Sequence, residues 1–220
     1  MNSTLKIGII DYGAGNIRSI TNALDYLDYD YKVIAEPKKL EACNTFILPG
    51  VGAFAEAMKR LNSSNLIEFL RNQVANHGKP LLGICLGLQL LGRSSTEDGF
   101  NEGFGWIDAV VDQLPEDGAT RVPHVGWNDI SFRSDDPLFQ NVETGTHFYF
   151  DHSFHMTCAD PSVVCATTTF GTREIVAAVK FDNVVAYQFH PEKSQNNGLR
   201  LYRNFLNYAE QLTHQCKSQD

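Results

Sequence analysis

The sequence predicts a single α/β domain: a mixed, mostly parallel central sheet flanked by helices, with a small antiparallel side sheet. Three observations predict this class. Short apolar runs alternate with helical patterns through the first half of the chain, as expected for parallel strands joined by helices. The second half carries short strand-like runs separated by turn residues, which is typical of antiparallel pairing. The 220 residues suffice for one sizeable core and show no linker or internal repeat.

The elements of the first half follow from their hydrophobic patterns. Short apolar runs predict buried strands over residues 6–10, 31–35, 45–48 and 80–84. Apolar side chains recur on one helical face over residues 17–27, and two further helical patterns cover residues 54–61 and 66–74. The stretch after the fourth strand, residues 86–91, is expected to be an amphipathic helix.

The second half is expected to extend the central sheet and to add the side sheet. Short strands are expected over residues 105–111, 127–132, 147–150, 163–169, 175–180 and 184–188. A closing helix is expected over residues 199–209. We therefore assign one domain to residues 1–212 and a polar tail to residues 213–220.

Composition excludes several classes of function. The formal net charge of −8 argues against a nucleic-acid-binding surface, which requires a basic patch. No apolar run approaches the roughly 18 residues that a membrane span needs, and the first residues lack a signal-peptide pattern. The five cysteines are an odd number and include no Cys-x-x-Cys pair. We expect a reduced cytoplasmic protein without disulfides, structural zinc, other metal or cofactor.

A cysteine at a strand-to-helix junction is the sharpest chemical signal in the chain. Residues 83–87 read Gly-Ile-Cys-Leu-Gly, so Cys85 follows an apolar strand and precedes a helix. Flanking glycines permit the tight turn of a nucleophile elbow, and a helix N-terminus favours a thiolate. The competing interpretation is a buried core cysteine, which we retain for Cys43, Cys158, Cys165 and Cys216.

A nucleophilic thiol needs a base, and one candidate follows about a hundred residues later. His190 and Glu192 lie two residues apart at the end of a predicted strand, where Pro191 stops the ladder. A histidine can accept the thiol proton and return it to a leaving amine, and a carboxylate can orient the imidazole. The alternative is a surface histidine with a chance neighbour, which the upstream Cys85 disfavours.

Two glycine-containing turns have functional interpretations. The turn Pro-Gly-Val-Gly over residues 49–52 follows a strand, and its backbone N–H groups can converge as an oxyanion hole. It can also be a plain turn into a helix. Gly13 and Gly15 suggest nucleotide binding, but Arg18 stands where the third glycine of that pattern belongs.

The histidines outside these motifs are expected to be structural. His124 precedes a predicted strand with a buried tryptophan. The histidines within residues 147–155 could be taken for a metal site together with Tyr149 and Asp151. Alternate strand positions point to opposite faces, so these side chains do not converge readily.

These motifs resemble those of the triad (class I) glutamine amidotransferases. The match covers essentially the whole chain in the family's order, through residues 49–52, 83–89 and 188–194. Residues 11–17, 122–128 and 148–153 further resemble the glutaminase subunits of imidazole glycerol phosphate synthases. The resemblance implies a flavodoxin-like fold and hydrolysis of glutamine to glutamate and ammonia through a cysteine thioester.

The resemblance also implies a role for each matching residue. Cys85 attacks the glutamine amide, His190 is the general base and then the acid, and Glu192 orients it. The oxyanion hole involves Gly50, Val51, Gly52 and Leu86, with a peptide at Val51 that can flip. The substrate contacts are Gly52, Gln89, Ser153 and Phe154. The residues that face the partner are Asn16, Tyr149 and Lys193.

The partner implied by the resemblance is a (β/α)₈-barrel cyclase, which forms a heterodimer with the glutaminase and receives its ammonia for histidine biosynthesis. Two residues depart from the pattern: Asp151 stands where valine is usual, and Phe154 where tyrosine is common. Asp151 leaves open a paralogous glutaminase that supplies ammonia to a sugar-aminating enzyme of surface polysaccharide biosynthesis.

Two other classes of protein compete with this interpretation. One is a different cysteine hydrolase on the same fold, such as a peptidase or a γ-glutamyl hydrolase, which would turn over without a partner. The other is a regulatory or scaffold module without catalysis. The presence of Cys85, His190 and Glu192 together disfavours the second.

Overall fold

A computed structural model describes residues 4–116, 121–133 and 135–217, the last three by their backbone alone. Its central sheet has eight strands in the order β2-β1-β3-β4-β14-β13-β12-β9. The parallel strands are β1 (Ile7–Ile10), β2 (Tyr31–Ile34), β3 (Thr45–Leu48), β4 (Leu81–Ile84) and β14 (Val184–Tyr187). The antiparallel strands are β13 (Arg173–Phe181), β12 (Val164–Phe170) and β9 (Ser131–Phe132). The fold class predicted from the sequence is confirmed.

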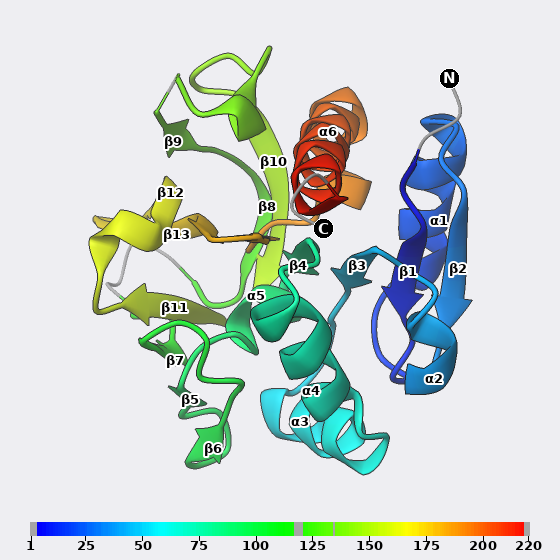
Figure 1. Ribbon diagram of the computed structural model, residues 1–220. Helices are drawn as coiled ribbons and strands as arrows, with labels where there is room; N and C mark the ends of the chain where they lie inside the picture. Colours follow the sequence, from blue (N-terminus) through cyan, green and yellow to red (C-terminus); the bar gives the residue numbers. More distant parts are fainter. Residues whose placement is uncertain (1–3, 117–120, 134, 218–220) are drawn as a thin grey trace.

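Helices cover both faces of the parallel part of the sheet. The helical segments are α1 (Ile17–Tyr26), α2 (Pro37–Leu40), α3 (Phe54–Ser63), α4 (Leu66–Leu70), η1 (Arg71–Asn76), α5 (Leu86–Gln89) and α6 (Gln195–Lys217). The apolar sides of α1 and α6 pack on one face, and those of α3, α4 and α5 pack on the other. Figure 1 shows α6 above the strands β3 and β4, with α3 and α4 below them. No helix among the described residues is long and apolar enough to cross a membrane.

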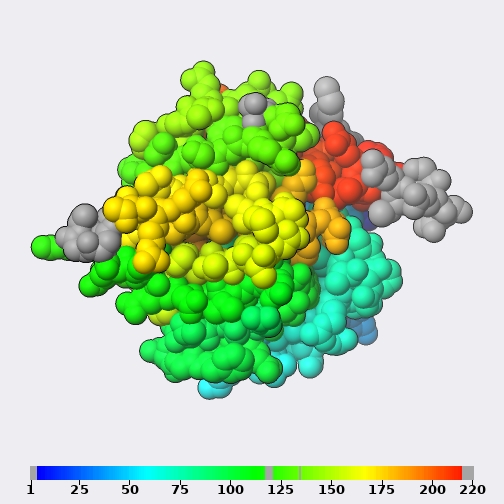
Figure 2. Space-filling model, turned by 90° about the vertical axis from the view of Figure 1, so that its left-hand side faces the viewer, coloured from blue at the N-terminus to red at the C-terminus, as the bar shows by residue number. Residues whose placement is uncertain are grey.

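Two smaller sheets lie at the antiparallel end. One is a ribbon of β8 (His124–Asp129) and β10 (His147–His152), and the other has the order β11-β7-β5-β6. The strands of the latter are β11 (Phe154–Cys158), β7 (Ala109–Gln113), β5 (Ser94–Ser95) and β6 (Asn101–Glu102). Short 3₁₀ segments are η2 (Pro137–Phe139), η3 (Pro161–Val163) and η4 (Pro191–Lys193). In Figure 2, residues of about 150–180, in yellow, form a band. Green residues of the β8–β10 ribbon lie on one side of it, and green residues of the four-stranded side sheet lie on the other.

Several element boundaries differ from the sequence prediction. The strand expected from residue 105 begins at Ala109 instead. The backbone N–H groups of Phe104, Trp106 and Ile107 donate to the carbonyls of Leu90 and Leu91, so this segment packs against the end of the elbow helix. Elements α2, β5, β6 and β11 were not expected. The strand expected over 127–132 is two strands, β8 and β9, separated at Ile130.

The elbow helix and the last helix also differ. Every residue of α5 is buried, so the predicted amphipathic character of residues 86–91 is wrong: this short helix is enclosed by other elements. Helix α6 runs from Gln195 to Lys217 and therefore includes the first part of the predicted tail. Residues 218–220 lie outside the described part of the chain.

Candidate active site

The sheet order brings the two predicted catalytic segments together. Strands β4 and β14 are parallel neighbours, and Ile84 lies opposite Tyr187. The residues that follow these strands therefore emerge side by side at the carboxyl edge of the sheet, where open α/β sheets bind ligands. Cys85 follows Ile84, and the segment leading to His190 follows Tyr187.

Cys85 occupies a sharp turn between β4 and α5. Its backbone has φ 54°, a left-handed conformation that non-glycine residues rarely adopt. Its N–H donates to the Tyr187 carbonyl at 2.7 Å, which ties the turn to β14. A Cβ at Gly87 would lie 2.2 Å from the Leu48 carbonyl oxygen, so only glycine allows the helix to approach β3 this closely.

His190 and Glu192 form a buried pair next to the thiol. The Nδ1 atom of His190 lies 2.7 Å from Glu192 Oε1, and both side chains are almost fully buried. Burial by itself lowers the pKa of His190, but hydrogen bonds to Cys85 and Glu192 and their negative charges raise it to about 10. A protonated imidazole beside the sulfur is the partner that a thiolate needs.

A cavity of about 340 Å³ collects most of the residues predicted to act on substrate. It is lined by Val51, Gly52, Cys85, Leu86, Gln89, Glu97, Pro123, Asp151, His152, Ser153, Phe154 and His190. Gly50 does not line it, because it lies beneath the turn, where an added Cβ would be 2.7 Å from the Leu86 Cβ. Glu192 lies behind His190, away from the cavity.

The turn over residues 50–52 separates this cavity from a second one. Val51 and Gly52 also line a neighbouring cavity of about 360 Å³, together with residues 13–15 and Arg60. Gly52 has φ +99°, and nothing lies within 4 Å of a Cβ placed there. Val51 is 41% exposed. There is free space on both sides of this peptide, and the oxyanion hole itself stays a prediction.

Side-chain amides connect the Phe154 carbonyl to the thiol. Gln89 Nε2 donates to the Phe154 carbonyl at 2.8 Å and to Gln188 Oε1 at 3.1 Å. Gln188 Nε2 lies 3.7 Å from Cys85 Sγ, and the Asp151 carbonyl lies 3.8 Å from the same sulfur. The sulfur thus lies between an amide nitrogen and a carbonyl oxygen.

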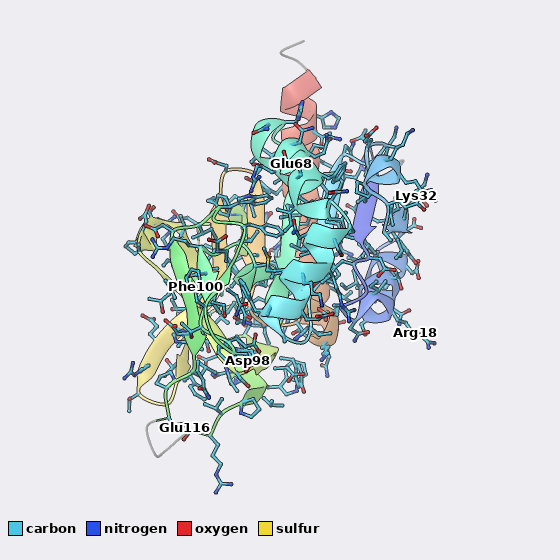
Figure 3. The ribbon with its side chains drawn as sticks, turned by 90° about the horizontal axis from the view of Figure 1, so that it is seen from below. Arg18, Lys32, Glu68, Asp98, Phe100 and Glu116 are labelled. Carbon is cyan, nitrogen blue, oxygen red and sulfur yellow. The ribbon has the colours of Figure 1, made fainter. Side chains whose placement is uncertain are left out.

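Glu97 is a cavity residue that the sequence did not single out. Its Oε2 accepts the N–H of Phe54 at 2.7 Å, so it caps α3 directly after the glycine turn. It belongs to the loop between β5 and β6, whose Asp98 and Phe100 are exposed; both residues are labelled in Figure 3. No local pattern marks Glu97, because the residue that it caps lies 43 positions away.

The predicted partner-facing residues fall in two places. Lys193 Nζ lies 5.3 Å from the centre of the Tyr149 ring and 3.4 Å from Asp151 Oδ2. Tyr149 in turn packs edge-on against Trp127, which is 46% exposed, so the expectation of a buried tryptophan in this strand is wrong. Asn16 is the N-cap of α1, where its Oδ1 accepts the Ser19 N–H at 3.4 Å.

The remaining histidines and cysteines have structural surroundings. His124 and His152 are buried against each other, whereas His147 lies on the exposed side of β10. Within the described ranges, no three His, Cys, Asp or Glu side chains are grouped as metal ligands. Burial raises the pKa of Cys43, Cys158 and Cys165 above the usual thiol value, so these thiols are poor nucleophiles. The side chain of Cys216 lies outside the described part of the chain.

Comparison with known proteins identifies the family. The family model "Glutamine amidotransferase class-I" matches residues 8–208. Imidazole glycerol phosphate synthase subunit HisH 2 of Vibrio vulnificus (strain YJ016) is 44% identical over 94% of this chain and 96% of its own length. The subunit HisH of Aquifex aeolicus (strain VF5) is 42% identical over 95% and 100%.

Solved structures agree on the fold. The structure of PurLQS from Thermotoga maritima superposes with a TM-score of 0.71 at 20% identity, covering 93% of this chain and 98% of that one. At this identity the likeness shows the shared fold alone. With the family model over nearly the whole sequence and curated relatives above 40% identity, the chain belongs to the class-I glutamine amidotransferases, a family of enzymes, as its motifs predicted.

Proposed function

We propose that this chain is the glutaminase subunit of an imidazole glycerol phosphate synthase, which hydrolyses glutamine and passes ammonia to a cyclase in histidine biosynthesis. Family membership and HisH relatives of nearly equal length support the assignment. The observation that carries the chemistry is a thiol on a strained elbow, in a 340 Å³ cavity, beside a buried histidine–carboxylate pair.

The first half-reaction forms a thioester. The Cys85 thiolate attacks the side-chain amide carbon of glutamine, and the carbonyl electrons move onto oxygen. Backbone N–H groups of Gly52 and Leu86 receive that oxyanion. The imidazolium of His190 then gives its proton to the departing nitrogen, the C–N bond breaks and ammonia leaves.

The second half-reaction returns the enzyme to its starting state. Neutral His190 takes a proton from water, and the resulting hydroxide attacks the thioester carbon. The C–S bond breaks, the γ-carboxyl group loses its proton to solvent as glutamate leaves, and the thiolate–imidazolium pair forms again. Glu192 keeps Nδ1 of His190 protonated and in place through both halves, since its carboxylate accepts from that atom.

The amino-acid end of glutamine carries an α-ammonium group and an α-carboxylate, and both need polar partners in the cavity. Gln89, Ser153 and Phe154 line the cavity and are proposed to supply polar contacts. Glu97 adds a carboxylate at the same cavity, which suits an α-ammonium group. We place Glu97 among the substrate-binding residues for this reason.

The partner proposed is a (β/α)₈-barrel cyclase that forms a heterodimer with this chain in the cytoplasm. The HisH relatives are named as subunits of a synthase. Tyr149, Lys193 and Asn16 are proposed to face that partner, next to the exposed Val51 and Trp127. A docked barrel would close the cavity mouth and keep ammonia from being protonated in water.

A second candidate is a paralogue that feeds a sugar-aminating enzyme. Asp151 favours it, because its carboxylate at the rim is paired with Lys193, one of the residues proposed to face the partner. A different charge pattern at the rim suits a different partner surface.

The deciding experiment measures glutaminase activity of the purified chain, alone and with a cognate cyclase plus an analogue of its nucleotide substrate. Low activity alone and strong stimulation in the mixture support the histidine-pathway role. Absence of stimulation, with Cys85 still labelled by a glutamine-like affinity reagent, rejects that partner and favours the sugar-aminating one. Absence of labelling as well rejects the glutaminase chemistry.

A further inference from the structure

Two buried histidines outside the triad are hydrogen-bonded to each other beside the cavity. His124 Nδ1 lies 3.0 Å from His152 Nε2. His152 lines the cavity, whereas His124 lies behind it on β8, stacked on Phe150 with ring centres 4.6 Å apart. Buried polar pairs of this kind are retained where they hold a particular arrangement.

The groups at the two ends of this series determine which atom donates in each hydrogen bond. The Phe154 carbonyl lies 2.8 Å from His152 Nδ1 and can only accept, so His152 carries its proton on Nδ1. His152 Nε2 must then accept from His124 Nδ1–H. That leaves His124 Nε2 to accept from Asn128 Nδ2, at 3.4 Å. Both imidazoles are neutral, and each tautomer is specified by its neighbour.

The far end of this chain of hydrogen bonds is a substrate-binding group. The Phe154 carbonyl that accepts from His152 also accepts from Gln89 Nε2, at 2.8 Å. Gln89 continues to Gln188, whose amide contacts the Cys85 sulfur. Hydrogen bonds therefore connect β8, through the wall of the cavity, to the residues that surround the thiol, with two donors meeting at the Phe154 carbonyl.

We propose that His124 is a positioning residue: by donating to His152 it holds the Phe154 carbonyl on Gln89 and so shapes the part of the cavity that binds glutamine. Without that donor, Nε2 of His152 is a buried acceptor with no partner, and the ring is free to tilt away from the Phe154 carbonyl. The effect on glutamine rests on the proposed glutaminase function, whereas the tautomer of His152 does not.

Two substitutions separate the hydrogen bond from packing. His124→Phe keeps a ring against Phe150 and removes the donor. His124→Asn removes the ring but keeps an N–H close to the position of Nδ1. The readouts are KM and kcat for glutamine and, by ¹⁵N-edited NMR of the imidazole at neutral pH, the tautomer of His152 and the exchange rate of its Nδ1 proton with water.

We expect His124→Phe to raise the KM for glutamine about threefold to tenfold, the loss of one buried hydrogen bond, with a smaller change in kcat. The same variant should speed the exchange of the His152 Nδ1 proton with water, because its hydrogen bond to the Phe154 carbonyl is weakened, and His124→Asn should restore both values in part. An unchanged KM and exchange rate in His124→Phe would overturn the proposal, as would a larger defect in His124→Asn.

The wild-type protein provides a test that does not depend on either variant folding. His152 must be the Nδ1–H tautomer there, and an Nε2–H signal overturns the proposal. A chain that has this tautomer but shows no glutaminase activity under any condition contradicts the proposed function, not the hydrogen-bond chain. The two failures are thereby distinguishable.

Discussion

Cys85 carries its thiol on a backbone with φ 54°, and such strain at a non-glycine residue costs roughly 1–3 kcal/mol. The surrounding contacts offset that cost: its N–H is bonded to Tyr187, and Gly87 lets the next turn pass close to β3. The sulfur is held at the cavity wall beside His190, where a substrate carbonyl can reach it. The backbone contacts of this one residue thus fix the position of the Cys85 sulfur.

We expect Cys85→Ala to abolish glutamine hydrolysis and to change the free energy of unfolding by no more than about 1 kcal/mol. Alanine keeps the same backbone and Cβ, and only a sulfur that faces a cavity is lost. Activity assays and urea unfolding measure the two effects. Cys43→Ala, which removes a buried thiol far from the cavity, is the control and should keep its activity. Turnover near the parent rate in Cys85→Ala would reject the nucleophile.

We expect His190→Ala to lower kcat on the order of 10²–10⁴-fold, the contribution of a general base, and Glu192→Ala to lower it less. Removing Glu192 takes away a hydrogen bond and a negative charge that raise the pKa of His190, so that pKa should fall. The rate of Cys85 alkylation by iodoacetamide as a function of pH reports this change. If Glu192→Ala proves more damaging than His190→Ala, the two roles are assigned wrongly.

The elements nearest the thiol are short and tightly fitted. Helix α5 has four residues, all buried, and reaches the sheet only because Gly87 has no side chain. The backbone carbonyls just after it, at residues 90–92, accept the N–H groups of residues 104–107. The side sheet is therefore attached to the elbow helix through the main chain, which keeps the cavity wall in register with the thiol.

At this scale we expect Gly87→Ala to destabilise the fold by about 3 kcal/mol or more, because the added Cβ would lie 2.2 Å from the Leu48 carbonyl oxygen. Gly92→Ala is the matched comparison, since its nearest Cβ contact is 3.2 Å, and it should cost less. Urea unfolding measures both. Equal costs for the two substitutions would show that the close approach at Gly87 relaxes easily.

At the scale of the whole molecule, the site exists because β4 and β14 are neighbours in the sheet although about a hundred residues separate them. The ribbon of β8 and β10 then adds Asp151 and His152 to the cavity, and Ser153 and Phe154 follow directly after it. Its inner side chains include His124 and His152, which the fold must bury in neutral form. That requirement makes the stability of the whole chain depend on pH.

Burial lowers the pKa of His124 to about 4 and that of His152 to about 3, from an ordinary value of 6.5. As the pH falls below 6.5, these two histidines take up protons in the unfolded chain but not yet in the folded one. The free energy of unfolding is therefore highest above pH 6.5 and decreases towards pH 4. We expect the urea concentration at the unfolding midpoint to decrease when the pH is lowered from 7 to 5. Most carboxylates titrate near about pH 4, so they contribute little over this range. A midpoint that stays constant over that range would contradict buried, neutral imidazoles.

The elbow, the histidine–carboxylate pair and most of the strands and helices were predictable from the sequence, since each is a short-range pattern; α2, β5, β6 and β11 were not. Gly-Ile-Cys-Leu-Gly between an apolar run and a helical pattern indicates a strand-to-helix turn, and residues two apart at a strand end stay together. Fold class and family followed, and the structure and comparisons confirmed both.

Only the tertiary structure decided which distant residues complete the site. Glu97 reaches the cavity by capping a helix 43 positions away, and the bond between His124 and His152 joins strands 28 positions apart. Gly50 and Gly52 look equivalent in sequence, yet one is packed under Leu86 and the other lies between two cavities. Such contacts leave no periodic trace, because they depend on how the strands are ordered in space.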